Sequence, residues 1–201
     1  MKLYYSPAAC SLVSHIILRE TGTAFDLHKV DLASHQTTDG QSYYEINPKG
    51  QVPLLELANG QRLSEGPIIA QYLAEQAQNT SLLPPTNTLQ RYRVLEWQNY
   101  ITSELHKSFS ILFHPVIDTV NKDIVRNGLR KKMEWVSAQL KDNSYLTGEQ
   151  FTIADAYLFV VCGWAQFVDI KLADLAPLQH FLDTVKQRPH VSAALQAEGL
   201  R

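Results

Sequence analysis

The stretch NPKGQVPLL, residues 47–55, runs from a polar turn directly into an apolar strand. Gly50 relaxes the backbone just before the strand. Pro53, at the first strand position, has no backbone N–H to donate to a neighbouring strand. The backbone N–H and C=O of Val52 are therefore predicted to stay free at a sheet edge, where an extended peptide could pair with them as an added strand. An ordinary loop with two prolines is the alternative interpretation.

Length and composition place the chain among ordinary globular proteins. Its 201 residues suffice for one large domain or two small ones, and its formal net charge of -2 offers no basic surface for nucleic acid. The longest apolar stretch, around residues 154–168, contains polar residues and is too short to span a bilayer. Cys10 and Cys162 lie far apart and resemble neither a disulfide framework nor a zinc site. With no signal-peptide pattern, we expect a cytoplasmic protein without a metal, a nucleic-acid partner or a membrane span.

Strand and helix patterns alternate through the first 78 residues. The expected elements are a strand at 2–6, a helix at 10–20, strands at 25–31, 53–57 and 61–63, and a helix that Pro67 opens. The first three form a βαβ unit, so their strands should be parallel. Asn59-Gly60 predicts a two-residue hairpin turn. The order βαβ then ββα predicts an α/β, thioredoxin-like domain over residues 1–78.

The rest of the chain is predicted to be helical. Residues 79–87, rich in proline and threonine, form the expected linker to an all-helical domain over residues 88–201. The helices are expected at 89–113, 122–141, 153–168 and 179–187. Thr152 has the form of an N-cap with Asp155 three positions on. The helix that follows is apolar nearly all round, so it should be the buried centre of this domain.

Cys10 falls at the predicted N-terminus of the first helix. The free N–H groups and the positive end of the helix dipole favour a thiolate there, so we expect the pKa of Cys10 to be lowered. A reactive thiol beside a binding site is the functional interpretation, and a small residue filling a helix start is the alternative. Position 13 is Val13, so there is no Cys-x-x-Cys, and any disulfide of Cys10 must form with another molecule.

Two further polar groups could bind a ligand. Backbone N–H groups at the helix start after Glu65-Gly66 favour a carboxylate, and the Glu65 side chain could take an ammonium group, unless the pair is only a helix cap. A polar band on the long helix contains Asn99, Ser103, Glu104, His106 and Lys107, which share a face by their spacing. A solvated face is the usual explanation of such a band, but His106 is suited to bind or assist a thiol near pH 7.

Taken together, these features resemble a bacterial cytosolic glutathione S-transferase of the beta class over essentially the whole chain. The most specific motifs are PAACSL at 7–12, NPKGQVP at 47–53, ELHK at 104–107 and FTIADAY at 151–157. The resemblance implies a glutathione S-transferase fold with a thioredoxin-like glutathione domain and a helical domain. It also implies a homodimer, a cis bond at Pro53, and glutathione as a co-substrate with no other cofactor.

The resemblance implies the site residues as well. Val52 would pair with the cysteinyl backbone of glutathione, Glu65 and Gly66 would hold the γ-glutamyl end, and Cys10 and His106 would lie near the sulfur as catalytic residues. The other expected glutathione-binding residues, some from across the dimer interface, are His35, Asn99, Ser103, Glu104 and Leu105.

Two positions depart from the common pattern. His35 stands where the class commonly carries a lysine for the glycine carboxylate. Because a histidine is only partly charged at neutral pH, we predict that glutathione binding weakens as the pH rises. Gly66 stands where many relatives outside the class have serine, so only its backbone N–H can serve. Other classes activate glutathione with a tyrosine on the first strand or a serine at the first helix, which keeps Tyr5 and Ser11 as minor candidates.

The expected activity is glutathione transfer to small hydrophobic electrophiles of the xenobiotic type, as in detoxification. Their binding pocket is expected among variable apolar residues such as Phe109, Phe113, Trp164 and Phe167. Cys10 could also hold glutathione as a mixed disulfide, which would add thiol–disulfide exchange. Two alternatives remain open: a glutathione-dependent reductase, dehalogenase or isomerase, and a non-catalytic protein-binding adaptor on the same fold.

Overall fold

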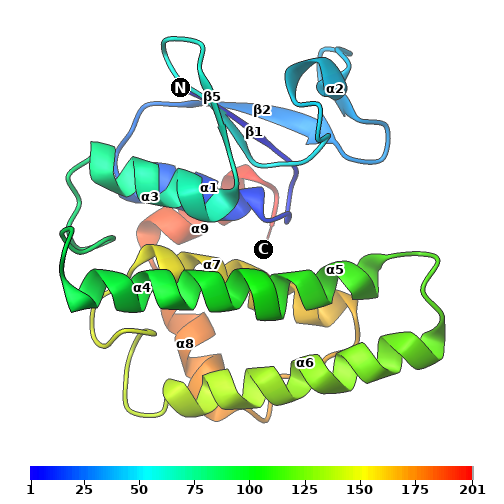
Figure 1. The fold of residues 1–201 in the computed structure, drawn as a ribbon, viewed down its shortest axis with the longest axis vertical. Helices are drawn as coiled ribbons and strands as arrows, with labels where there is room; N and C mark the ends of the chain where they lie inside the picture. Colours follow the sequence, from blue (N-terminus) through cyan, green and yellow to red (C-terminus); the bar gives the residue numbers. More distant parts are fainter. Residues whose placement is uncertain (201) are drawn as a thin grey trace. The chain divides into compact units, whose positions relative to one another are not determined.

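A computed structural model describes residues 1–200 of the chain, which form two compact units (Figure 1). The first unit comprises Met1–Thr80 together with the end of the chain from Arg188, and the second comprises Ser81–Gln187. Among residues 1–200, no helix combines the length and the apolar character that a membrane crossing requires.

The first unit is organised by a five-stranded mixed sheet of order β3-β2-β1-β4-β5. Its strands are β1 (Lys2–Tyr5), β2 (Asp26–Asp31), β3 (Gln36–Thr37), β4 (Leu54–Glu56) and β5 (Arg62–Ser64). β1 pairs in parallel with β2 and antiparallel with β4, with Leu3 opposite Leu27 on one side and Leu55 on the other. The predicted parallel βαβ unit and the thioredoxin-like order are therefore confirmed.

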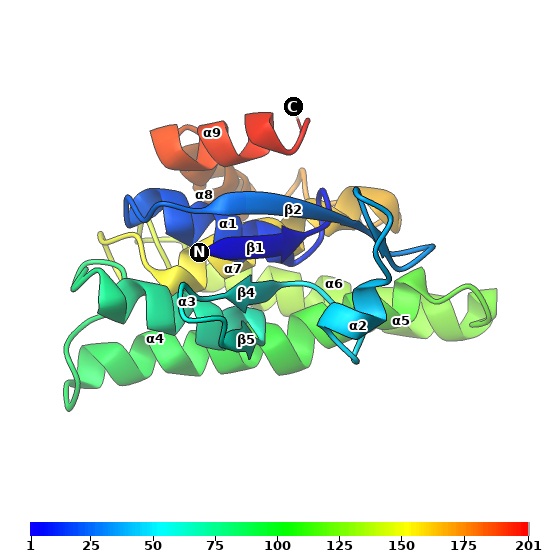
Figure 2. The same cartoon turned by 90° about the horizontal axis from the view of Figure 1, so that it is seen from above.

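Helix α1 is the centre of the first unit. The helices here are α1 (Ser11–Glu20), α2 (Tyr43–Ile46), α3 (Gly66–Gln76) and α9 (Pro189–Ala197). Every residue of α1 from Ser11 to Leu18 is buried, because β1, α3 and α9 all pack against it (Figure 2). This burial on every side keeps the start of α1, where Cys10 lies, in a fixed position.

The end of the chain packs differently from the expected domain division. We grouped residues 88–201 into one helical domain and expected no helix beyond Pro189, whereas α9 packs on α1 of the first unit. Glu198 fastens it there: one carboxylate oxygen lies 2.9 Å from Nδ1 of His15, and the other accepts the N–H of Ala8 at 3.2 Å. The side chains of His15 and Glu198 are both fully buried. No local pattern signals such contacts.

Three shorter features of the first unit also differ from expectation. β3 and α2 occupy a segment expected to be irregular. The hairpin between β4 and β5 exists, but the Leu57 N–H donates to the Gln61 carbonyl at 2.8 Å, so its loop has three residues rather than two. Gly60 supplies the positive φ of +80° that such a loop needs.

The second unit is all-helical. Its elements are α4 (Leu89–Tyr100), the π-helix η1 (Ile101–His106), α5 (Lys107–Phe113), α6 (Thr119–Gln139), α7 (Ile153–Gly163), the 3-10 helix η2 (Trp164–Phe167) and α8 (Ala176–Lys186). The expected long helix over 89–113 is therefore present, with an unpredicted π-helical segment in its middle. α7 is almost entirely buried and contacts α4, η1 and α8, which confirms it as the centre of this unit.

The predicted capping motif of α7 is present. Asp155 accepts hydrogen bonds from the backbone N–H of Thr152 at 2.8 Å and from its hydroxyl at 2.6 Å. Its other oxygen accepts the N–H of Leu146 at 2.8 Å. Burial raises the pKa of Asp155 to about 6 despite these three bonds. One side chain thus joins the start of α7 to the loop before it.

Candidate functional site

The stretch at residues 47–53 is held by its own hydrogen bonds. The Gly50 N–H donates to the Asn47 carbonyl at 2.8 Å, which closes a tight turn. The Asn47 side chain and the Tyr43 hydroxyl both donate to the Gln51 carbonyl, at 2.7 and 2.9 Å. The Val52–Pro53 bond that follows is cis, as the resemblance implied. The backbone of Val52 is therefore presented by a well-supported turn.

Gly50 also brings His35 to this turn. It adopts φ +64°, and a Cβ added to it would lie 2.6 Å from Cε1 of Tyr44 and 3.0 Å from Nδ1 of His35. The rings of His35 and Tyr44 are 4.5 Å apart between centroids. Nδ1 of His35 is buried and has no hydrogen-bond partner among residues 1–200. Only glycine fits at position 50, and it allows His35 to pack against the turn.

Cys10 is the N-cap residue of α1, and its thiol donates a hydrogen bond to the Val52 carbonyl at 3.2 Å. The expectation of a lowered pKa was wrong. Burial raises the pKa of Cys10 to about 11, and the nearby Glu65 carboxylate adds to the rise. The backbone N–H groups at the start of α1 act in the opposite direction, but they are outweighed. Without a ligand, the thiol is therefore held in its protonated form.

Glu65 lies at the start of α3 with its carboxylate accessible to solvent. Its backbone has φ +70°, and its side chain is 64% exposed. Lys49 places its Nζ 2.7 Å from the Glu65 carboxylate and 3.0 Å from the Ser64 hydroxyl. A Cβ added at Gly66 would lie 3.7 Å from the Pro53 side chain, an ordinary van der Waals distance, so a larger residue would not clash there. Lys49 could not be predicted from the sequence, because its pairing with Glu65 depends on how the turn folds back.

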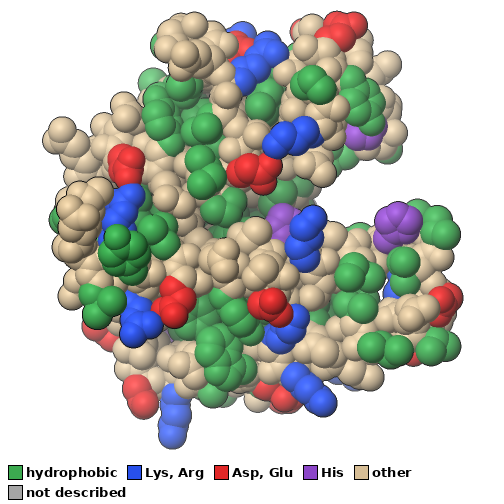
Figure 3. Space-filling model, viewed as in Figure 1, with side chains coloured by type: hydrophobic (Ala, Val, Ile, Leu, Met, Phe, Trp, Pro, Cys, Tyr) green, Lys and Arg blue, Asp and Glu red, His purple; other side chains and the backbone are tan. Residues whose placement is uncertain are grey.

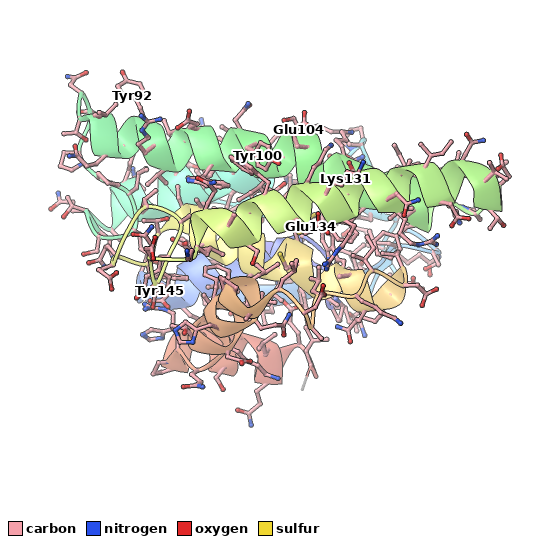
Figure 4. All side chains as sticks on the ribbon, turned by 90° about the horizontal axis from the view of Figure 1, so that it is seen from below. Tyr92, Tyr100, Glu104, Lys131, Glu134 and Tyr145 are labelled. Atoms are coloured by element: carbon pink, nitrogen blue, oxygen red, sulfur yellow. The ribbon has the colours of Figure 1, made fainter. Side chains whose placement is uncertain are left out.

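The second unit holds the remaining expected residues on and beside η1. Asn99 and Ser103 are exposed one turn apart, and the Ser103 hydroxyl donates to the Asn99 carbonyl at 3.0 Å. Glu104 forms an ion pair with Lys132 of α6. The Lys132 Nζ lies 2.8 Å from the Glu104 carboxylate and donates a hydrogen bond to its carbonyl oxygen at 3.1 Å. In Figure 4, Glu104 lies on the long helix beside α6. Leu105 is fully buried, so only its backbone can contact a ligand.

His106 contacts two aromatic side chains that follow it in the sequence. Its Nδ1 lies 2.6 Å from the hydroxyl of Tyr157 in α7. Its ring centroid lies 4.8 Å from that of Trp164 in η2. Tyr157 belongs to the motif at residues 151–157, but no role was predicted for it. The sequence did carry a signal for such a role: Tyr157 lies in a helix predicted to be buried, and the hydroxyl of a buried tyrosine usually needs a hydrogen-bond partner.

Three of the four aromatic residues expected to line the electrophile pocket form one cluster. The Phe109 ring is fully buried and lies 5.7 Å from Trp164 and 6.5 Å from the half-exposed Phe113, between centroids. Phe167 is 61% exposed. The cluster places partly exposed aromatic surface close to His106.

The minor candidates do not have the geometry of a thiol activator. The Ser11 hydroxyl is buried, donates to the Ser6 carbonyl at 3.2 Å and accepts the Ser6 N–H at 3.2 Å. Tyr5 is 8% exposed, and burial raises its pKa. Both cysteines are free, and Cys162 lies buried beside Met133 in the core, as predicted. Within the described part of the chain, no three His, Cys, Asp or Glu residues are grouped to hold a metal ion.

The surface carries charges of both signs. On the face shown in Figure 3, acidic and basic side chains are interspersed. Several form ion pairs within one unit, such as Arg130 with Asp174 at 2.6 Å. On this face, charges of one sign are therefore not gathered in a single patch.

Comparison with known proteins agrees with this architecture. Two family models match, "Glutathione S-transferase, N-terminal domain" over residues 9–76 and "Glutathione S-transferase, C-terminal domain" over residues 88–197. The chain is 48% identical to glutathione S-transferase GstA of Escherichia coli O157:H7 over 201 residues, which is 100% of both chains. It resembles the solved beta class glutathione S-transferase of Sphingomonas chungbukensis, with 41% identity, a TM-score of 0.95 and 100% of both chains covered. A sphingomonad glutathione S-transferase solved with glutathione matches at 40% identity and a TM-score of 0.95, again over 100% of both chains.

Proposed function

Because the chain belongs to the glutathione S-transferase family, in its bacterial beta class, we propose that it joins glutathione to small hydrophobic electrophiles of the xenobiotic type. The observation that carries this proposal is the arrangement around Val52 in the first unit. The hydrogen-bonded turn presents the Val52 carbonyl, the Cys10 thiol lies 3.2 Å from that oxygen, and Glu65 is close enough to raise the pKa of the thiol. A peptide that pairs with Val52 would therefore carry its cysteine toward Cys10.

Each end of glutathione then has a suitable partner in the first unit. The cysteinyl backbone pairs with Val52. The γ-glutamyl ammonium binds the exposed Glu65 carboxylate, and its carboxylate binds the N–H of Gly66 at the start of α3. The glycine carboxylate binds His35, whose buried Nδ1 has no other partner within residues 1–200. The other proposed glutathione-binding residues are Asn99, Ser103, Glu104 and Leu105, the last through its backbone.

The reaction needs a glutathione thiolate near neutral pH. The glutathione thiol gives its proton to solvent water, and the N–H groups at the start of α1 and the side chain of His106 stabilise the negative charge that remains. The thiolate attacks the electrophilic carbon and forms the C–S bond. In a substitution, the leaving group departs as an anion with the bonding electrons. Cys10 lies at the same helix end, where it contributes to the environment of the sulfur.

A second activity follows from Cys10 itself. Attack of its thiolate on the disulfide of oxidised glutathione would give a mixed disulfide at Cys10 and release one glutathione thiolate. A glutathione thiolate would then attack the glutathione sulfur of this mixed disulfide, which forms oxidised glutathione and releases the Cys10 thiolate. Since burial raises the pKa of Cys10 to about 11, this exchange should be slow near neutral pH. We also propose a cytoplasmic homodimer, because the chemistry needs reduced glutathione and part of each site is expected from the partner subunit.

Calorimetric titration of the reduced protein with reduced glutathione tests the proposal. We expect saturable binding, which Glu65→Ala should weaken at least about tenfold because a charge-assisted bond is lost. Conjugation is followed with a chloronitrobenzene, which releases chloride. Cys10→Ala should abolish exchange but only partly reduce conjugation. Absence of binding at millimolar glutathione would contradict the proposal and favour the adaptor on the same fold.

A further inference from the structure

His106 is held on two sides by aromatic residues of the second unit. Its Nδ1 lies 2.6 Å from the Tyr157 hydroxyl, and the two rings meet edge to face at 83°. Trp164 covers the ring from another direction, at 64° and 4.8 Å between centroids. The orientation of the imidazole is therefore set by groups outside its own helix.

The backbone of His106 is fixed separately. It ends the π-helix η1, and the Ser110 hydroxyl donates to its carbonyl at 3.2 Å. Lys132 attaches η1 to α6 through both the carboxylate and the carbonyl of Glu104. π-Helical segments of this kind occur frequently at functional sites. Because separate contacts fix the ring and the backbone of His106, its Nε2 points in a single direction.

Tyr157 is equally well placed. It is 3% exposed on α7, whose first turn is fastened by the three hydrogen bonds of Asp155. A tyrosine hydroxyl is neutral near pH 7 and donates readily, and a neutral imidazole has one nitrogen that accepts and one that donates. When the Tyr157 hydroxyl donates to Nδ1, the ring proton must lie on Nε2.

We propose that Tyr157 is a positioning residue that holds neutral His106 with its proton on Nε2. This proposal rests on the role proposed above for His106 and makes it specific. An Nε2–H donates a hydrogen bond to an anionic sulfur and stabilises it, whereas a general base would need Nε2 without a proton. In the role proposed for it above, His106 therefore acts as a hydrogen-bond donor rather than as a general base, and the glutathione thiol gives its proton to solvent water.

Kinetics of Tyr157→Phe, His106→Ala and the double variant test the coupling. Tyr157→Phe should lower kcat about three- to tenfold, the effect of one hydrogen bond, and leave KM for glutathione unchanged. In the His106→Ala background, the same substitution should have no further effect. The matched control is Tyr145→Phe, which removes a hydroxyl from the same unit (Figure 4) and should retain full activity. An equal loss from Tyr157→Phe in both backgrounds would show a merely structural role and overturn the proposal.

A spectroscopic measurement tests the proton position without reference to activity. In ¹⁵N-labelled protein above the pH of imidazolium formation, His106 should show a protonated Nε2 and an unprotonated Nδ1. Tyr157→Phe should shift both signals toward the average of the two tautomers. A proton on Nδ1 in the unmodified protein would overturn the assignment. If His106→Ala keeps full activity, the proposed role of His106 fails, whereas the tautomer is decided by the spectrum alone.

Discussion

The Cys10 thiol donates its hydrogen bond to the carbonyl oxygen of Val52 at 3.2 Å. The Cys10 thiol therefore occupies the Val52 carbonyl oxygen that is proposed to accept a hydrogen bond from the peptide backbone of glutathione. A thiolate would be repelled by that oxygen, so the contact suits only the protonated form. Ligand binding and the state of Cys10 are therefore expected to be coupled.

The first prediction concerns the reactivity of Cys10. Burial raises its pKa from 9.0 to about 11, so at pH 8 its thiolate fraction should be about 100-fold below that of an unperturbed cysteine. The rate of alkylation by iodoacetamide should be correspondingly low at pH 8 and should keep rising up to about pH 11. The Cys10→Ala variant gives the background from Cys162. An alkylation rate that levels off below pH 8 would show that the N–H groups at the helix start, and not burial, determine the pKa of Cys10.

The second prediction concerns Lys49, whose Nζ forms an ion pair with the Glu65 carboxylate at 2.7 Å. A ligand ammonium must displace it, but an exposed ion pair contributes only about 0.2–1 kcal/mol. Lys49→Met should therefore raise the preference for glutathione over its deamino analogue by up to about fivefold, more at low salt. Calorimetry with both ligands measures this ratio. Lys49→Arg should keep the original ratio, and a lowered preference in Lys49→Met would contradict the idea of competition.

The third prediction uses the histidine at position 35. A protonated imidazole attracts the glycine carboxylate more strongly than a neutral imidazole does. Binding of S-methylglutathione, which has no thiol to ionise, should weaken between pH 6 and pH 8. In the His35→Lys variant the affinity should stay constant over that range. Identical affinities at the two pH values in the unmodified protein would refute the prediction.

The fourth prediction concerns the start of α7. Asp155→Ala removes acceptors from the Leu146 N–H and from both the N–H and the hydroxyl of Thr152 in a buried site. The free energy of unfolding should fall by about 2–5 kcal/mol. Urea denaturation measures the loss. The control is Asp123→Ala on the exposed side of α6, which should change stability by less than about 0.5 kcal/mol.

The fifth prediction concerns the attachment of α9. Glu198→Ala leaves the buried Nδ1 of His15 and the N–H of Ala8 without their acceptor. We expect a loss of about 2–5 kcal/mol and earlier proteolytic cleavage near Arg188. Because Ala8 lies two residues before Cys10, faster alkylation of Cys10 should accompany the change. Glu198→Gln, which keeps an acceptor, should restore part of the stability. Unchanged proteolysis in Glu198→Ala would show that α9 is held by apolar packing alone.

Much of the fold could be predicted because its signals are local. The parallel βαβ unit follows from a strand, a helix and a strand in sequence, and the start of α7 follows from Thr152 and Asp155 three residues apart. The turn before Pro53 is likewise specified by neighbours. The short elements β3 and α2 could not be predicted, since two to four residues carry too little periodicity.

The sequence by itself determined which chemical groups are present and where each lies on its strand or helix: Cys10 at a helix start, Glu65 before another, and His106 on a polar face. Only the tertiary structure decided how those groups behave. Burial reversed the expected pKa of Cys10. Partners distant in the chain, separated by 16 residues for Lys49–Glu65, 51 for His106–Tyr157 and 183 for His15–Glu198, set the remaining contacts. The reason is physical: helix and turn formation depend on adjacent residues, whereas solvation and charge depend on whatever the folded chain packs alongside them.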